Sequence, residues 1–317
     1  MAELLTLEES ITAVEEAFRL YAEGKALKPA LMHVDSVDGE FHIKAGGLEL
    51  GPRYFALKLN GGFFQNMKRF SMPNIQGVII LASGENGYPL AIMDSTEITI
   101  KRTGAAAAVA ARYLARPDSK VATICGCGTQ GRIQLEAIKS VLPLELAYVY
   151  DVEKGKAESF AAQVAKDLKL IVEATDELGA AVRKSDVVVT CTPSRQPLLM
   201  KSQVSGGTFI AAMGADSPDK QELDPELLKA NTVVVDLLEQ CAVVGELHHA
   251  IAAGMKKEAV HAELGEIVAG RKPGRRSEEE IIIFDGTGTA LQDVAAAATV
   301  YEKAFKRRRG KLLDLFK

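Results

Sequence analysis

The sequence lacks the features that would place the protein in a membrane or on nucleic acid. No apolar stretch reaches the length of a membrane span, and the acidic N-terminal segment Met1–Leu5 is not a secretory signal peptide. Basic residues are not in excess, since 38 Lys and Arg face 42 Asp and Glu for a net charge of −4. The one basic cluster, residues 306–311, is interpreted as a solvated helix end, with a nucleic-acid or membrane patch as the weaker alternative. We therefore expect a soluble protein that binds neither partner.

Cysteine is scarce, and its spacing indicates neither a zinc site nor a disulfide framework. None of the four cysteines forms a C-x-x-C pair, and they are Cys125, Cys127, Cys191 and Cys241. Three of them lie in or beside apolar runs typical of strands. We interpret them as small buried residues in a reducing compartment, so the cytoplasm is the expected location.

Histidine shows no metal-binding motif either. The sequence has no H-E-x-x-H, and a helix surface or cap explains Glu246, His248 and His249 better than metal ligation. His33 and His261 are likewise interpreted as structural. We therefore expect no metal ion in the functional site.

A glycine motif organises the rest of the chain. The buried strand Val121–Ile124 runs into Gly126-x-Gly128-x-x-Gly131, and a helical pattern follows at once. The first glycine allows a tight turn, the second lets the backbone approach a pyrophosphate, and the third lets helix and strand pack closely. Asp151 ends the next apolar run, 20 positions after Gly131, where an acid bonds the adenosine ribose hydroxyls. Strand, glycines, helix and acid in this order predict a dinucleotide site rather than a glycine-rich turn.

From Lys120 onward the chain alternates strands and helices. This alternation predicts a parallel sheet covered by helices on both faces. The stretch 238–273 is less clear, and 289–307 reads as a last helix that returns to the first domain. The predicted strands are 121–125, 146–151, 170–174, 186–191, 208–213, 232–236 and 280–284, and the predicted helices 129–141, 153–168, 176–184 and 224–230.

The first third of the chain has a different rhythm. Residues 7–26 show helical spacing, with Gly24 and Pro29 as stop signals, and a small-residue helix over 95–115 closes the segment. Between these helices glycine-containing turns separate strand candidates at 33–37, 40–45, 54–59, 77–82 and 89–94. No βαβ unit occurs here, so this segment is not part of the nucleotide fold. The 317 residues suffice for two medium domains.

Four charged residues could form a substrate pocket beside the nucleotide. Lys58 is a lone cation inside an apolar strand, and Lys44 shares a strand face with His42. Arg102 carries a planar fork that suits a carboxylate, and Asp216 directly follows a predicted parallel strand, an end that faces the active-site crevice. Each also has a plainer interpretation: solvent-facing lysines, a surface arginine and an Asx-turn.

Taken together, these segments resemble the ornithine cyclodeaminase / mu-crystallin family over nearly the whole chain. The motifs that carry the resemblance are Tyr88–Asp94, Arg102–Ala106, Gly126–Gln130, Thr192–Arg195, Gly214–Asp216 with Lys220–Asp224, and Phe284–Gly288 with Gln292–Asp293. The resemblance implies a homodimer. It also implies an α/β fold with a Rossmann-type doubly wound parallel sheet (117–288) and a smaller α+β substrate and dimerisation domain (1–116 with 289–317).

The resemblance also implies the roles of individual residues. Lys58 and Arg102 would contact a substrate carboxylate, and Asp216 would be the catalytic acid or base, with Lys58 as the second catalytic residue. The expected cofactor contacts are Thr103, Gly126, Gly128, Thr129, Gln130, Gly131, Asp151, Thr192, Pro193, Ser194, Met213, Gly214, Thr287 and Gly288.

The sequence departs from the family pattern between Phe41 and Gly47. Many members have a Met-Pro pair here, and ornithine cyclodeaminases have a nearby glutamate for the distal amine. Lys44 would repel that ammonium, and it would take over the carboxylate role of an arginine missing from Pro29–His33. This departure makes ornithine cyclodeamination a weaker candidate for the function without excluding it.

Three functions follow from the resemblance. The first is an NAD(H)-dependent oxidoreductase acting on the Cα–N bond of an amino acid or cyclic imino acid, such as a ketimine or pyrroline-carboxylate reductase or an alanine dehydrogenase. The second is an ornithine cyclodeaminase that recycles NAD, and the third is a non-enzymatic binder of the mu-crystallin type. Asp151 favours NAD because its carboxylate repels a 2′-phosphate, while Lys154 leaves some tolerance of NADP.

Overall fold

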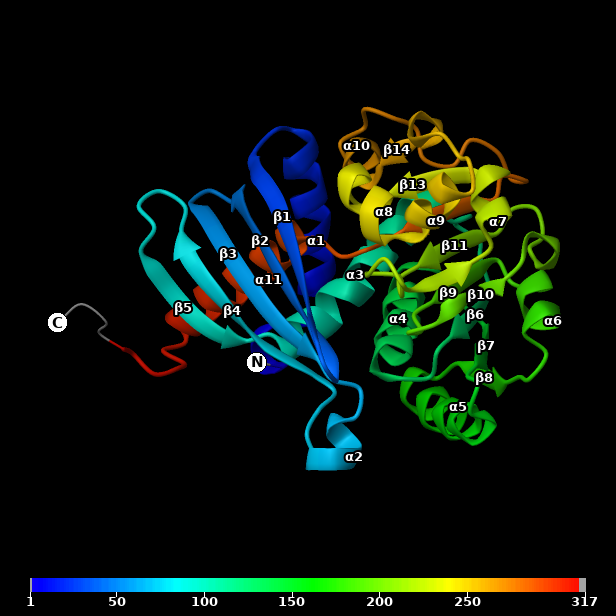
Figure 1. Cartoon of the computed structure of the whole chain (residues 1–317), viewed down its shortest axis with the longest axis horizontal. Coiled ribbons are helices and arrows are strands. Elements are labelled where there is room, and N and C mark those ends of the chain that lie inside the picture. The colour runs from blue at the N-terminus through cyan, green and yellow to red at the C-terminus, as the bar shows by residue number, and fades with distance from the viewer. Residues whose placement is uncertain (1, 314–317) are drawn as a thin grey trace.

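The computed structural model describes residues 2–313, and two sheets dominate it. Figure 1 shows an antiparallel sheet on one side, a parallel sheet on the other, and helix α3 running between them. A 3-10 turn, η1 (Ala2–Leu4), leads into α1 (Leu7–Ala22), whose start is fixed by a capping box between Thr6 and Glu9. No helix in the described range is both long and apolar enough to cross a membrane.

The antiparallel sheet has five strands, in the order in which they occur in the chain. A short helix that the sequence pattern does not predict, α2 (Asn66–Phe70), lies in the connection between the third strand and the fourth. The strands are β1 (Ala26–Ser36), β2 (Gly39–Glu49), β3 (Arg53–Gly62), β4 (Ile75–Ser83) and β5 (Pro89–Asp94).

The inner face of this sheet is the one covered by a helix. The inner face packs against the last helix, α11 (Ala290–Lys306), and shares one apolar core with it. Strand alternation also places Lys44 and Lys58 on this face, where they are cross-strand partners. The inner face therefore carries both part of the core and the polar side chains of the site.

Helix α3 (Thr96–Leu114) connects the antiparallel sheet to the parallel one. Its segment Ala105–Ala111 is buried and belongs to the same core as β6, β9 and β11. Alanine side chains allow this close approach of the helix to its neighbours. The division into 1–116 with 289–317 and 117–288 stays a prediction, and its residues 1 and 314–317 lie outside the described range.

The parallel sheet has eight strands covered by helices. The strands are β6 (Val121–Cys125), β7 (Leu146–Tyr150), β8 (Ile171–Ala174), β9 (Val187–Thr190), β11 (Phe209–Ala212), β13 (Thr232–Val235), β14 (Ala262–Glu263) and β15 (Ile282–Asp285). The helices are α4 (Thr129–Val141), α5 (Lys154–Leu168), α6 (Leu178–Arg183), α7 (Pro225–Lys229), α8 (Leu238–Val244), α9 (Glu246–Ala252) and α10 (Leu264–Val268). Shorter pieces are β10 (Arg195–Leu199), β12 (Gln221–Leu223), η2 (Lys201–Gln203) and η3 (Lys257–Ala259).

The strand order places a ligand crevice at the centre of the sheet. In the order β14-β13-β15-β11-β9-β6-β7-β8 the chain runs outward from β6 to β8 on one side and from β9 to β11 on the other, and the last strand, β15, lies between β11 and β13. This reversal is the topological switch point, outside which doubly wound folds bind their ligands. The predicted fold class, a Rossmann-type sheet plus a smaller domain with an antiparallel sheet, is confirmed.

The predicted boundary that differs most from the structure is the start of the first strand, β1. The predicted helix 7–26 ends at Ala22, and Gly24 adopts a φ of +77°, as a stop signal should. β1 begins at Ala26 rather than at His33, because Pro29 lies inside the strand instead of before it. β1 is an edge strand, where a missing N–H is tolerated, and its register shifts between Leu27 and Ala30.

Candidate functional site

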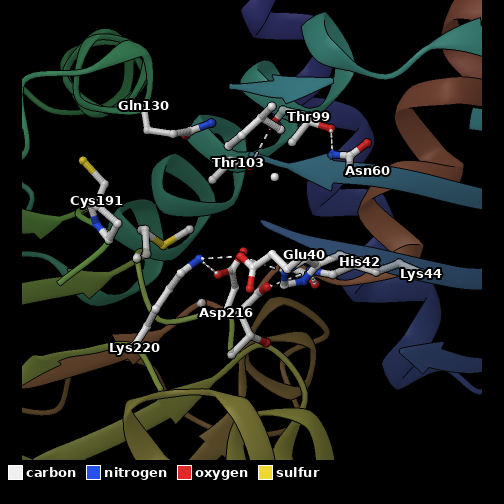
Figure 2. Close-up of a pocket in the computed structure, with 18 of the residues that line it drawn as sticks. Glu40, His42, Lys44, Asn60, Thr99, Thr103, Gln130, Cys191, Asp216 and Lys220 are labelled. Carbon is white, nitrogen blue, oxygen red and sulfur yellow. Dashed lines mark hydrogen bonds and ion pairs between the residues drawn. The ribbon is translucent and has the colours of Figure 1, made fainter. Parts of the chain in front are cut away.

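A cavity of about 210 Å³ lies between the two sheets at the switch point. One wall comes from the loops after β6, β9 and β11, and the opposite wall from the inner face of β2 and β3. Figure 2 shows side chains from the two walls pointing toward one another across this space. Residues far apart in the sequence therefore form one site.

Buried cations form one side of the cavity around a single carboxylate. The Lys58 ammonium lies 2.8 Å from both carboxylate oxygens of Asp293, and Arg102 Nε lies 3.1 Å from Oδ1 of the same carboxylate. Arg102 Nη1 also donates to Gln292 Oε1 at 3.1 Å. Lys58 and Asp293 are each 2% exposed, so the solvent-facing interpretation of Lys58 is wrong. Arg102 is buried too, which excludes a surface arginine.

Lys44 is the third buried cation, and it holds the loop before α11. Its ammonium donates to the carbonyl oxygens of Thr287 (2.9 Å) and Gly288 (2.6 Å). Asp236 fixes the same loop, accepting from Thr287 Oγ1 at 2.9 Å and from Gly288 N at 2.7 Å. Gly288 has a φ of +75°, and a Cβ there would collide with the Arg102 guanidinium, so the loop requires glycine. The solvent-facing interpretation of Lys44 is therefore wrong.

The charges at this wall do not balance. Lys58 and Arg102 contact Asp293, and Lys44 acts on it electrostatically. Burial lowers the pKa of Lys58 to about 7, with Arg102 and Lys44 acting in the same direction and Asp293 against them. Burial and Arg102 also lower the pKa of Lys44. A buried excess of positive charge is stabilised by an anionic partner. The wall is therefore suited to a small carboxylate.

Asp216 lies on the opposite wall in a network of charges. Its Oδ1 accepts from Lys220 Nζ at 2.6 Å, and Lys220 also lies 3.6 Å from Glu40 Oε1 on β2 (Figure 2). Burial acts to raise the pKa of Asp216, but Lys220, His42 and Lys44 together lower it well below its ordinary value. Asp216 is thus an ionised carboxylate that faces the cavity, not the carboxylate of an Asx-turn.

The glycine motif has the predicted geometry. Gly126 has a φ of +106°, and a Cβ on Gly131 would collide with the Gly126 carbonyl oxygen. A Cβ on Gly128 would meet no protein atom, which leaves the face of the loop open to a ligand. Asp151 accepts from Cys127 N at 2.9 Å at the end of β7. Lys156 lies 2.8 Å from its carboxylate. Lys154, the residue expected to leave some tolerance of NADP, pairs with Asp176 at 3.1 Å.

The predicted cofactor residues fall into two groups. Those that line the cavity are Thr103, Gln130, Thr192, Pro193, Met213, Gly214, Thr287 and Gly288. Those that lie outside its lining are Gly126, Gly128, Thr129, Gly131, Asp151 and Ser194. The second group, apart from Ser194, surrounds the glycine turn and the end of β7, the part of such a fold that faces the adenosine half of a dinucleotide. All these assignments stay predictions.

Glu222 is a site residue that the sequence analysis missed. It is fully buried, and its carboxylate accepts from Thr192 N (2.6 Å), Thr192 Oγ1 (2.7 Å) and Gly214 N (2.9 Å). Glu246 in turn accepts from the backbone N–H of Glu222 at 2.7 Å. Glu246 is the buried first residue of α9, so of its two expected positions, a helix surface or a cap, the surface is wrong. Glu222 fixes the loops at the carboxyl ends of β9 and β11, and Glu246 fixes β12, the strand that carries Glu222.

The four cysteines form no disulfide, and Cys125, Cys127 and Cys241 are buried as predicted. Cys191, for which burial is also predicted, is only partly buried and lines the cavity. His249 bonds the carbonyl of Lys220 at 2.8 Å and His261 that of Pro273 at 3.0 Å, both structural roles. His33 differs, because it lies in a cluster with Glu40 and His42.

The fold and the cavity are typical of a class of protein: enzymes that use a dinucleotide, which such folds bind at the switch point of a Rossmann sheet. A family model described as ornithine cyclodeaminase/mu-crystallin family matches residues 1–308. The chain belongs to this family, which confirms the resemblance seen in its motifs.

Three known proteins are similar over almost the whole chain. Alanine dehydrogenase of Archaeoglobus fulgidus is 42% identical over 316 residues, 99% of this chain and 96% of that protein. An archaeal alanine dehydrogenase dimer with bound NAD superposes with a TM-score of 0.94 at 42% identity, covering 99% and 96% of the two chains. The Δ1-pyrroline-2-carboxylate reductase of Thermococcus litoralis, in complex with NADH and L-proline, has a TM-score of 0.93 at 34% identity, covering 98% and 97%. These relatives bear out the predicted enzyme class and NAD as its cofactor.

Proposed function

We propose that the protein is an NAD-dependent oxidoreductase that reduces the C=N bond of a small imino acid, such as a cyclic ketimine carboxylate. The observation that carries this proposal is the cavity itself, which sets a buried cationic wall opposite an ionised acid beside the nucleotide loop. The alanine dehydrogenase and pyrroline-carboxylate reductase relatives support the substrate class.

Each wall has its own task in the proposed reaction. Lys58 and Arg102, with Lys44 bonded to the loop before α11, bind the substrate carboxylate and so fix Cα. NADH, when bound, supplies the hydride. Asp216 is ionised, so it stabilises the protonated imine nitrogen and, in the oxidative direction, accepts a proton from the amino group. A non-enzymatic binder would need none of this opposed arrangement of charges.

A substrate comparison tests this proposal. Purified protein is mixed with NADH and Δ1-pyrroline-2-carboxylate, with NADH, pyruvate and ammonia, and with NAD and L-ornithine, and both cofactor absorbance and ammonia are followed. We expect stoichiometric loss of NADH with the cyclic imine in the absence of ammonia. Loss of NADH only with pyruvate and ammonia would instead identify an alanine dehydrogenase. If the protein binds NAD but turns over none of these substrates, the function that remains is that of a non-enzymatic binder.

Ornithine cyclodeamination is the second candidate, and Glu40 is the observation that favours it. This carboxylate lines the cavity opposite the cationic wall, where it could bind a distal ammonium. It is already engaged by His42 Nε2 at 3.2 Å and by Lys220, which weakens its attraction for a further cation. Free ammonia and proline from ornithine, with no net change in NADH, would establish this activity and overturn the reductase.

Substrate affinity should fall above neutral pH, because burial lowers the pKa of Lys58 to about 7. Below that pH the ammonium is present and attracts the carboxylate; above it the free enzyme loses this charge. We expect the Kd of pyrrole-2-carboxylate, an unreactive mimic with no group that titrates in this range, to be constant below pH 7. It should then rise by up to about tenfold per pH unit. A Kd independent of pH between 6 and 9 would contradict the role of Lys58.

The outer face of the antiparallel sheet is proposed as a homodimer interface. Its exposed apolar side chains include Met32, Val34, Val78, Ile80 and Ile92, and Ile80 pairs directly with Ile92. A dimer with bound NAD among the similar structures supports this proposal.

The free cysteines support a cytoplasmic location for the protein.

Ile80→Asp should dissociate this dimer, because it buries an unpaired charge in the interface. We expect the dimer dissociation constant to rise about 30-fold or more, measured by analytical ultracentrifugation. Ile171→Asp is the control, since Ile171 is also exposed but lies on β8 of the other sheet. Equal behaviour of the two variants would rule out this face.

A further inference from the structure

The hairpin of β1 and β2 carries a square of four metal-ligand side chains at its tip. His33 and His42 are cross-strand partners, and so are Asp35 and Glu40. Because directly paired residues share a face and alternate residues along a strand do too, all four side chains project from the inner face of the hairpin. The pattern is His-x-Asp on one strand and Glu-x-His on the other.

The separations of the donor atoms match the edges of a small coordination polyhedron. His33 Nε2 lies 3.0 Å from Asp35 Oδ1 and 3.7 Å from Glu40 Oε2, and His42 Nε2 lies 3.2 Å from Glu40 Oε1. One donor atom each from His33, Glu40 and His42 fall within 4.8 Å of one another. Zinc–ligand bonds of about 2.0–2.2 Å in a tetrahedron set donors about 3.4 Å apart. Small side-chain rotations would bring these three groups onto one ion, and the exposed Asp35 carboxylate beside His33 would turn to supply the fourth ligand.

The charge and position of the square also suit a cation. Two carboxylates and two imidazoles carry a net charge of −2 when the histidines are neutral, and Asp216 adds a third carboxylate nearby. Two cations lie nearby, and each has other partners. Lys44 bonds the carbonyl oxygens of Thr287 and Gly288, and Lys220 bonds Asp216 more closely than Glu40, at 2.6 Å against 3.6 Å. A second cavity, lined by His33, Asp35 and Glu40, opens the square to solvent.

We propose that His33, Asp35, Glu40 and His42 form a binding site for one divalent transition-metal ion of the zinc type at the mouth of the substrate cavity. Two imidazoles select such an ion over Mg²⁺ and Ca²⁺, which prefer oxygen ligands alone. Glu40 and His42 also line the substrate cavity, so the ion would lie between that cavity and solvent. This replaces the structural role expected for His33.

Metal titration of the untagged, chelator-treated protein tests the proposal without reference to catalysis. We expect wild-type protein to bind one Zn²⁺ per chain by isothermal titration calorimetry, to gain thermal stability with Zn²⁺, and to gain none with Mg²⁺ or Ca²⁺. His33→Ala should bind at least about 10-fold more weakly, since even residues behind a ligand contribute that much. Asp35→Asn should weaken binding too, and it preserves folding because Asp35 is 89% exposed.

Two matched controls separate this site from adventitious binding. His248→Ala removes one of the three histidines outside the square, and Asp38→Asn makes the same charge change as Asp35→Asn at the turn of the same hairpin. Both should bind Zn²⁺ like the wild type. No binding by the wild type, or equal binding by His33→Ala and the wild type, would overturn the site. Failure of the imine reductase assay would not affect either result.

Discussion

Replacing Asp216 by asparagine is expected to lower the turnover of the imine or amino acid by about 10²–10⁴-fold, the range for loss of a positioned acid or base. The amide keeps the size of the side chain but neither stabilises a protonated imine nor accepts a proton. Lys220, its partner at 2.6 Å, retains Glu40 as a counter-charge, so the loop should stay in place. The measurement is kcat with saturating substrate and cofactor.

Two controls define what this result means. NADH binding by Asp216→Asn, followed by fluorescence, should equal that of the wild type, because Asp216 is predicted to face the substrate rather than the glycine loop. Asp219→Asn makes the same change three residues later, at a side chain that is 74% exposed, and should leave kcat unchanged. Full turnover by Asp216→Asn would remove this residue from the mechanism, whatever the substrate.

The sequence predicts the parallel sheet well because each of these strands has a local apolar pattern. Runs such as Val121–Cys125 are apolar on both faces and lie between helices with clear periodicity. β10 and β12 are missed because Arg195–Leu199 and Gln221–Leu223 are short and partly polar. Such strands are held by pairing with each other, which no local pattern records.

The candidate site is only half visible in the sequence, for a similar reason. Lys58 and Arg102 attract notice because a charge in an apolar or motif context is costly. Their counter-ion, Asp293, is one acid in an alanine-rich helix, 235 positions from Lys58 in the chain. Glu222 and Lys220 lie inside a recognised motif, yet their roles depend on which loops they bond after folding. Long-range partners of this kind require the three-dimensional structure.

Among substitutions in the site, replacing Asp293 by asparagine should therefore lower the free energy of unfolding the most. It leaves Lys58 and Arg102 buried without the carboxylate that both contact, and breaking a buried ion pair costs about 3–5 kcal/mol. Part of this cost depends on pH. The pKa of Lys58 is already lowered to about 7, and loss of Asp293 lowers it further. Urea unfolding should show a greater loss at pH 6 than at pH 9, where Lys58 is neutral.

Two further variants identify the buried charge as the cause. Asp167→Asn removes a carboxylate that pairs with Arg132 but is 49% exposed, and it should change the free energy of unfolding by less than about 1 kcal/mol. Lys58→Met combined with Asp293→Asn removes one of the stranded cations and should recover part of the lost stability. A double variant no more stable than Asp293→Asn would show that packing around the helix, rather than unbalanced charge, sets the cost. The cationic wall would then lose its main support as a carboxylate site, because an excess of positive charge that the protein tolerates freely needs no anionic substrate to balance it.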